Sequence, residues 1–362
     1  MRDLLGLYPE EIFEVVKSLG DKPFRAKQLL KWIYTKGVSD FNEMTDLSVD
    51  FRSRLSSRFR IGGLTPERTT RTGREDGKDG AEICGEETTK LLFRLKDGEA
   101  VESVIIPDGK KRTLCVSSQV GCPLGCAFCL TGKMGFVRNL TAAEIVGQVI
   151  AAGGYLSDTG DDGREGEEKI SNIVFMGMGE PFLNYDEVAR AVDVISSGWG
   201  LGFSWRRITV STAGIPEAIL KFGTERNVNL AVSLNAPDDE TRSSIMPINR
   251  RYPISELIAA LKGYPLKKGR RITLEYVLLK GINDTEDHAV NLVRTISGLK
   301  AKVNLIPFNT YPGAVFERPD GERISRFQSI LIDANINAII RKSRGGEILA
   351  ACGQLATGKV AK

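Results

Sequence analysis

From about residue 100 onward, the sequence alternates between short strand patterns and helical patterns. The predicted strands are rich in β-branched and apolar residues and lie at 113–119, 172–178, 206–212, 229–234, 271–279 and 302–308. Helical patterns lie between or after them, at 142–156, 186–197, 215–223, 254–263 and 285–298. Six strand–helix units in a row restrict the fold to parallel strands, in a full or partial barrel or in a doubly wound sheet.

The first hundred residues show a different pattern of elements. They contain three helical patterns, at 10–20, 23–37 and 48–59. A polar glycine-rich stretch at 66–88 indicates a loop or weak strand, and two strand patterns joined by a turn follow at 89–95 and 100–106. We therefore predict three regions along the chain. They are a small helical and hairpin accessory domain over residues 1–98, a barrel over 99–345, and a C-terminal loop over 346–362.

Composition excludes a membrane protein. The chain has 362 residues, of which 41% are hydrophobic and 27% are charged, which is typical of a soluble globular protein. No apolar run approaches the roughly 20 residues that a bilayer-spanning helix needs, and the first residues have no signal-peptide core. We expect a cytoplasmic monomer with reduced thiols.

Positive charge is only slightly in excess, with 50 basic and 46 acidic residues, but it is clustered. Short basic runs lie at 110–112, 206–207, 250–251, 267–271 and 341–344. If the fold gathers them on one face, they can neutralise several phosphates of a nucleic acid. A scattered, solvated surface explains the same runs equally well at this stage.

Half of the six cysteines fall within the segment GCPLGCAFCL at 121–130. Cys122, Cys126 and Cys129 have C-x₃-C-x₂-C spacing and follow the first predicted parallel strand, where barrel active sites gather. A structural zinc site needs four ligands, so Cys115 would have to join them, because the lone histidine, His288, lies in a helical pattern. A disulfide is weaker still. Three thiols instead suit a 4Fe–4S cluster with one open iron, which can bind S-adenosylmethionine and cleave it to a radical.

Polar residues also end several later strands. Gly179 and Glu180 lie in MGMGEP, and Ser211, Ser233 and Asn309 end three further strands. Taken singly, such residues are more often turn formers or helix caps. As a set at the mouth of a barrel, they predict a ring of groups around a bound cofactor, with Glu180 accepting from the ligand ammonium.

The motifs TLCVSSQVGCPLGCAFC, FMGMGEP, VSTAGI, MPINRRYP, PFN and AACGQL together resemble the RlmN/Cfr family of radical S-adenosylmethionine RNA adenine methyltransferases, over about residues 5–358. The stretch IPDGKKRTLCVSSQ is similar to the C2-methylating branch. The resemblance implies a partial (β/α)₆ barrel with an N-terminal RNA-binding accessory domain. It also implies one 4Fe–4S cluster, two S-adenosylmethionine molecules per turnover, and an electron donor such as flavodoxin. The substrates would be 23S rRNA and some tRNAs.

The same resemblance assigns roles to further residues. Cys352 in AACGQL would carry the methyl group, Cys115 would release the product by forming a disulfide with Cys352, and Glu102 would accept the C2 proton. Ser233, Leu234 and Asn235 match a cofactor-contacting motif that usually reads S-L-H-A-P, so Asn235 replaces a histidine. Cys84 matches no motif.

Two alternatives stay open at this stage. C8 methylation of the same rRNA adenosine is the nearer one. A non-catalytic iron–sulfur RNA-binding protein is the other, although binding alone gives Cys352 no task.

Overall fold

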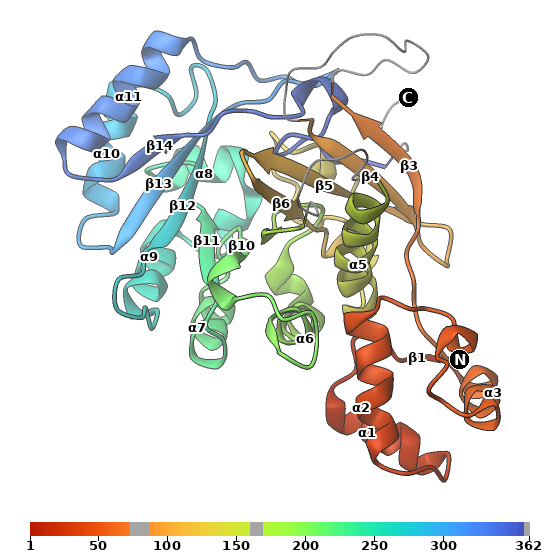
Figure 1. Cartoon of the computed structure of the whole chain (residues 1–362). Helices are drawn as coiled ribbons and strands as arrows, with labels where there is room; N and C mark the ends of the chain where they lie inside the picture. The colour runs from red at the N-terminus through yellow and green to blue at the C-terminus, as the bar shows by residue number, and fades with distance from the viewer. Residues whose placement is uncertain (73–86, 160–168, 358–362) are drawn as a thin grey trace.

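The computed structural model describes residues 1–72, 87–159 and 169–357 (Figure 1). Cys84 and most of the acidic stretch at 157–169 lie outside this part of the chain. A ten-stranded sheet has the order β14-β13-β12-β11-β10-β9-β6-β5-β4-β3. Its strands are β3 (Pro66–Arg71), β4 (Thr89–Arg94), β5 (Ala100–Asp108), β6 (Lys111–Cys115), β9 (Asn172–Phe175), β10 (Ile208–Thr212), β11 (Asn229–Ser233), β12 (Ile272–Leu278), β13 (Ala301–Pro307) and β14 (Ala338–Ile340).

All six predicted parallel strands are confirmed, and β14 continues the parallel series. Neighbouring strands follow one another in sequence without a reversal of order, so the sheet is not doubly wound. β14 and β3 form its two ends and are not paired with each other. The fold is therefore the predicted partial barrel, and it is open.

The helices of the barrel alternate with the strands and lie outside the curved sheet (Figure 1). They are α5 (Ala142–Thr159), α6 (Tyr185–Ser196), α7 (Pro216–Glu225), α8 (Asp239–Ile245), α9 (Ile254–Gly263), α10 (Glu286–Thr295) and α11 (Gly321–Asp333). The sequence Thr141-x-x-Glu144 has the spacing that predicts a capping box, and this box is present at the start of α5. The Glu144 N–H donates to Thr141 Oγ1, and the Thr141 N–H donates to Glu144 Oε2. No helix in the described ranges has the length and apolar character for a membrane crossing.

The N-terminal helices form a small subdomain beside α5 and α6 (Figure 1). They are α1 (Pro9–Ser18), α2 (Phe24–Leu30), which continues as a π-helical turn (Lys31–Thr35), and α3 (Val49–Arg58); β1 (Arg2–Asp3) pairs with β2 (Phe59–Arg60). The Tyr8 hydroxyl donates to Asp193 of α6 at 2.9 Å, and the rings of Tyr8 and Tyr34 contact Trp199 edge-on. These contacts hold the subdomain against the barrel.

The hairpin strands that precede the barrel join its sheet. β3, β4, β5 and β6 pair successively in antiparallel fashion, and β6 then pairs with β9 in parallel. Hydrogen bonding between β4 and β5 thus crosses the domain boundary predicted at residue 98. The three predicted regions stay a prediction about folding units, while the sheet itself is continuous across the first boundary.

Candidate active site

The three clustered cysteines lie on a tight loop at the carboxyl end of the parallel strands. The loop runs from β7 (Gln119–Gly121) to α4 (Leu130–Lys133), and β8 (Phe136–Asn139) returns to pair with β7. Gly121 has φ +72°, and a Cβ there would lie 1.9 Å from the Gly135 carbonyl oxygen, so only glycine fits. The Cys122 N–H donates to the same oxygen at 2.8 Å. The hairpin therefore fixes the start of the cysteine loop.

The donors around these thiols fit an iron–sulfur cluster. All three are free and half-buried. The Leu124 N–H hydrogen-bonds the Cys122 sulfur, and the N–H groups of Thr131 and Gly132 hydrogen-bond the Cys129 sulfur. Hydrogen bonds to sulfur are one of the means by which proteins tune such clusters. Burial raises the pKa of Cys122 to about 12, so metal binding must displace its proton.

Among the described residues, no three His, Cys, Asp or Glu side chains are arranged to hold a single metal ion. His288 is used elsewhere: its Nδ1 lies 2.6 Å from the Thr285 hydroxyl in the cap of α10. Three thiols with N–H donors and no fourth protein ligand match a cluster with an open iron.

Arg242 of α8 lies beside Cys126 and was not singled out from the sequence. Its side chain is fully buried, and it forms no ion pair within the described ranges. It donates to the Leu234 carbonyl at 3.0 Å and to Asn249 Oδ1 at 2.8 Å, and it also reaches the carbonyls of Ala213 and Ser233, at 2.5 and 3.2 Å. Burial lowers its pKa to about 10, which leaves it charged at neutral pH. A buried cation thus faces the cysteine loop and ties together the ends of β10 and β11.

Gly179 and Glu180 form a tight turn against β7. Gly179 has φ +100°, and a Cβ there would lie 2.5 Å from the Cβ of Gln119, so the expected close backbone approach is made to this chain's own residues. The Glu180 carboxylate is buried and accepts the Ala213 N–H at 2.7 Å and the Phe182 N–H at 3.0 Å. Burial raises its pKa. Contact with a ligand ammonium stays a prediction.

The other predicted cofactor residues divide into two groups. Ser211 and Ser233 are half-buried at the carboxyl ends of β10 and β11, whereas Leu234 is buried in the core. Asn235 is also buried: its φ is +57°, its Oδ1 accepts the Val277 N–H at 2.8 Å, and its carbonyl accepts from Asn283. Asparagine tolerates this left-handed backbone well. Its amide oxygen therefore serves the fold, and a cofactor contact through it stays a prediction.

The segment that carries Cys352 is hydrogen-bonded to the cysteine loop. The Leu130 N–H donates to the Gly353 carbonyl at 2.7 Å, and the Thr131 hydroxyl donates to the Leu355 carbonyl at 2.6 Å. Asn309, at the end of β13, donates to the Cys352 carbonyl at 3.4 Å. We call residues 349–356 the relay segment.

Glu102 holds the other side of the relay segment. It lies on β5 with 2% of its surface exposed, so it is not a surface residue. Its Oε1 is 3.1 Å from Lys90 Nζ, and its Oε2 accepts the Ala356 N–H at 3.0 Å. Lys90 also donates to the Leu349 carbonyl at 3.3 Å. Burial raises the pKa of Glu102 against the opposing effect of Lys90. The carboxylate predicted as a proton acceptor therefore also positions Cys352.

Cys115 and Cys352 are the other two cysteines among the described residues, and both thiols have a raised pKa. Cys115 ends β6 and is buried, and its pKa is raised first by burial and then by Cys352. Cys352 is exposed, yet its sulfur is surrounded by enough protein that desolvation raises its pKa to about 11, with a further contribution from Glu275. Glu275 of β12 is buried, accepts the Asn304 amide at 3.0 Å, and has a pKa raised by burial to about 7. A mid-strand acid gives no sequence signal, so Glu275 was missed.

Comparisons with known proteins agree with this geometry. Residues 2–61 match the ribosomal RNA large subunit methyltransferase N-terminal domain, and residues 116–293 match the radical SAM superfamily. A dual-specificity RNA methyltransferase RlmN from Syntrophobacter fumaroxidans is 49% identical over 345 residues, 95% of each chain. The same-named protein of Anaeromyxobacter dehalogenans is 46% identical over 354 residues, covering 98% of this chain and 91% of its own.

This chain belongs to the RlmN family. A crystal structure of a radical SAM methyltransferase from Sphaerobacter thermophilus has a TM-score of 0.88 and 44% identity, covering 98% of this chain and 99% of its own. The family resemblance inferred from the motifs is thereby confirmed, and so are the radical SAM fold and an S-adenosylmethionine and iron–sulfur chemistry. That Cys122, Cys126 and Cys129 are the residues that hold the cluster stays a prediction.

Proposed function

We propose that this RNA methyltransferase methylates C2 of an adenosine in 23S rRNA and in some tRNAs. One observation carries the proposal: the segment bearing Cys352 is hydrogen-bonded directly to the loop of Cys122, Cys126 and Cys129, through Leu130 and Thr131. Cys115 lies close enough to Cys352 for the Cys352 thiol to raise the pKa of Cys115. A cluster-binding protein without a reaction needs neither thiol, and the relatives' printed name supports RNA as the substrate.

Each residue of the site has its own role in the proposed reaction. Cys122, Cys126 and Cys129 would hold a 4Fe–4S cluster, which, with two S-adenosylmethionine molecules per turnover, supplies the methyl group and the hydrogen-abstracting radical. The Cys352 sulfur loses its proton and accepts the methyl carbon, and that carbon then bonds to C2 of the adenine. Glu102 accepts the C2 proton. Gly179, Glu180, Ser211, Ser233, Leu234, Asn235 and Asn309 surround the cofactor.

Cys115 completes the cycle. Its sulfur loses its proton and attacks the Cys352 sulfur, so that an S–S bond forms and the bond between the Cys352 sulfur and the methylene carbon breaks. The electron pair of the broken bond goes to that carbon, which takes up a proton to complete the methyl group, and the methylated RNA is released. The resulting disulfide must be reduced before the next turnover. We assign this reduction and the cluster's electrons to a donor of the flavodoxin type, in a monomer that works in the cytoplasm, where thiols are kept reduced.

The Cys115→Ala variant tests this proposal. It keeps the methyl-accepting sulfur of Cys352 but has nothing to attack it, so it should accumulate as a covalent protein–RNA conjugate. A denaturing gel with labelled RNA will show a slow band that nuclease reduces to protein with one modified nucleotide. Cys352→Ala and the double variant should form none. Normal turnover by Cys115→Ala, or a conjugate without Cys352, contradicts the mechanism, and mapping of the modified base separates C2 from C8 methylation.

A further inference from the structure

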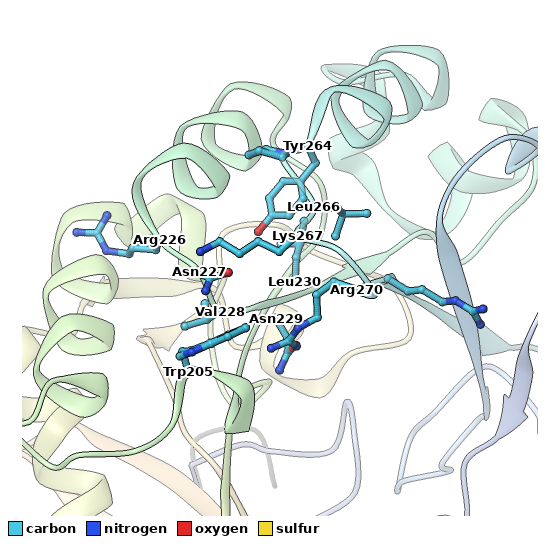
Figure 2. A pocket seen from close by; sticks show the side chains of 12 residues that line it. Trp205, Arg226, Asn227, Val228, Asn229, Leu230, Tyr264, Leu266, Lys267 and Arg270 are labelled. Carbon is cyan, nitrogen blue, oxygen red and sulfur yellow. The ribbon is translucent and has the colours of Figure 1, made fainter.

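A small pocket opens at the edge of the sheet opposite the cysteines (Figure 2). Trp205 lies just before β10, Asn229 begins β11, and Arg270 and Arg271 lie just before β12. Since these strands are parallel, their amino ends share one edge, and the catalytic cysteines lie beyond their carboxyl ends. A five-residue strand is roughly 17 Å long. We call this cavity the amino-edge pocket.

Three cations surround one indole ring in the amino-edge pocket. Relative to the Trp205 ring centroid, the Arg270 guanidinium carbon lies at 4.2 Å, that of Arg206 at 5.0 Å and Lys267 Nζ at 5.9 Å. Across the described residues, none of the three cations forms an ion pair. Cation–π contacts contribute only about 0.5–1 kcal/mol at exposed sites and leave the charge uncancelled.

Arg226, which also lines the pocket, shows how a cation with acidic partners differs. Arg226 lies 2.9 Å from Asp193 and 2.6 Å from Glu225. Arg270, by contrast, has a buried Nη2 without a hydrogen-bond partner, and its pKa is lowered first by burial and then by the charge of Arg206. The pocket therefore holds mutually repelling positive charges and an unused donor, which an anion would satisfy.

The size of the pocket restricts the anion. The volume open to the centre of a water-sized sphere is about 20 Å³, and about 10–15 Å³ of such volume holds one water. A phosphate group fits at the opening, whereas a nucleobase does not fit inside. Guanidinium groups pair with phosphate through two parallel hydrogen bonds. An adjoining open hollow, lined by Arg206, Arg207 and Phe203, extends the basic surface outward.

We propose that the amino-edge pocket binds a backbone phosphate of the RNA substrate, as a second contact remote from the target base. The inference rests on the proposed function, because the RNA must also place its adenosine at the opposite edge. A folded RNA of tRNA size is longer than the separation of the two edges, so one molecule can contact both. A minimal hairpin around the target adenosine cannot.

The test uses cluster-loaded enzyme and two matched double variants. Arg206→Gln/Lys267→Gln, the pocket variant, removes two of the cations around the Trp205 ring, and Arg294→Gln/Arg326→Gln, the control variant, removes two from α10 and α11. Binding of a full-length tRNA transcript and of a minimal hairpin is measured against salt. For the pocket variant, we expect tRNA affinity to fall about tenfold and the slope of log affinity against log salt to become shallower by about 0.8, since one lost phosphate contact contributes 0.7–0.9. Binding of the hairpin by the pocket variant and binding of the tRNA by the control variant are the references for these two changes.

A direct readout uses inorganic pyrophosphate as the probe. It should change the fluorescence of the wild-type enzyme and leave that of Trp205→Phe unchanged, and the pocket variant should need at least tenfold more pyrophosphate. Equal tRNA affinity and salt slope for wild type and the pocket variant overturn the inference, as does an acidic peptide that binds the pocket while tRNA binding stays unchanged. Failure of the wild type to methylate even the hairpin would instead contradict the proposed function.

Discussion

At the carboxyl edge of the parallel sheet, Glu102, Glu180 and Arg242 each have several protein partners. At the amino edge, Arg206, Lys267 and Arg270 surround one indole ring, and none of the three forms an ion pair with an acid in the described part of the chain. The first arrangement holds groups in fixed positions around a reaction. The second leaves charge available for something that arrives from solution. The contrast suggests that this chain keeps its chemistry and part of its RNA affinity on different edges.

The variant with the largest expected effect should abolish the chemistry at the carboxyl edge and leave RNA binding at the amino edge unchanged. Cys126→Ala deletes one of the three proposed iron ligands with no spare thiol at suitable spacing, so we expect loss of the cluster and of all methylation. The salt dependence of tRNA binding should stay that of the wild type, because the amino-edge cations are untouched. Iron and sulfide analysis and a binding titration measure the two quantities. Near wild-type iron content in this variant would contradict the ligand assignment, and a changed salt slope would break the comparison.

A smaller effect, on the free energy of unfolding, should distinguish the buried and hydrogen-bonded Arg242 from Lys267 at the amino edge. Arg242→Met leaves the carbonyls of Leu234, Ala213 and Ser233 buried without a donor, so we expect the free energy of unfolding to fall by at least about 4 kcal/mol. Lys267→Met at the amino edge is the matched control and should change it by less than about 0.5 kcal/mol. Anaerobic urea denaturation of the cluster-loaded proteins gives both values. Equal losses in the two variants would show that the edges do not differ in this way.

The smallest of these effects depends on pH. Glu275 has a folded-state pKa raised to about 7 from its ordinary 4.5, so the folded state binds more protons than the unfolded state between these values, and its contribution to stability falls as pH rises through this range. Glu275→Gln should therefore be more stable than wild type at pH 8, by up to about 3 kcal/mol, and similar at pH 4. Lys267→Gln should leave the profile unchanged. A wild-type slope retained in Glu275→Gln would place the titrating group elsewhere.

Local patterns were sufficient to predict most elements of the barrel, although the short helix α8 was not predicted. Alternation and helical spacing gave all six strands, and Thr141 and Glu144 gave a helix start, because these signals depend on neighbours in the sequence. β14, with three residues, is too short to show a pattern, and the 13-residue helix α11 was overlooked. The addition of β3, β4 and β5 to the barrel sheet depends on long-range pairing that no local signal shows.

The residues of the site also divide into those that a local sequence pattern shows and those that only the tertiary fold brings together. The cysteine spacing and the strand-end positions of Ser211 and Ser233 could be found in the sequence. Arg242 could not, since DETRSS resembles a solvated helix start and only the tertiary fold buries its guanidinium. Glu102 and Asn235 were identified through the family resemblance, but the hydrogen bonds that commit them to the relay segment and to β12 depend on partners 254 and 42 residues away.

Those distant partners bear on the order in which the molecule assembles. The relay segment is held by hydrogen bonds that close loops of 224 and 254 residues, to Thr131 and to Glu102. Contacts of such high sequence separation form only after the intervening chain is organised. Cys352 should therefore reach its place after the cysteine loop and the strands are formed. Docking of the segment then acts as a late folding step, so an incompletely folded chain does not yet hold Cys352 beside the cysteine loop.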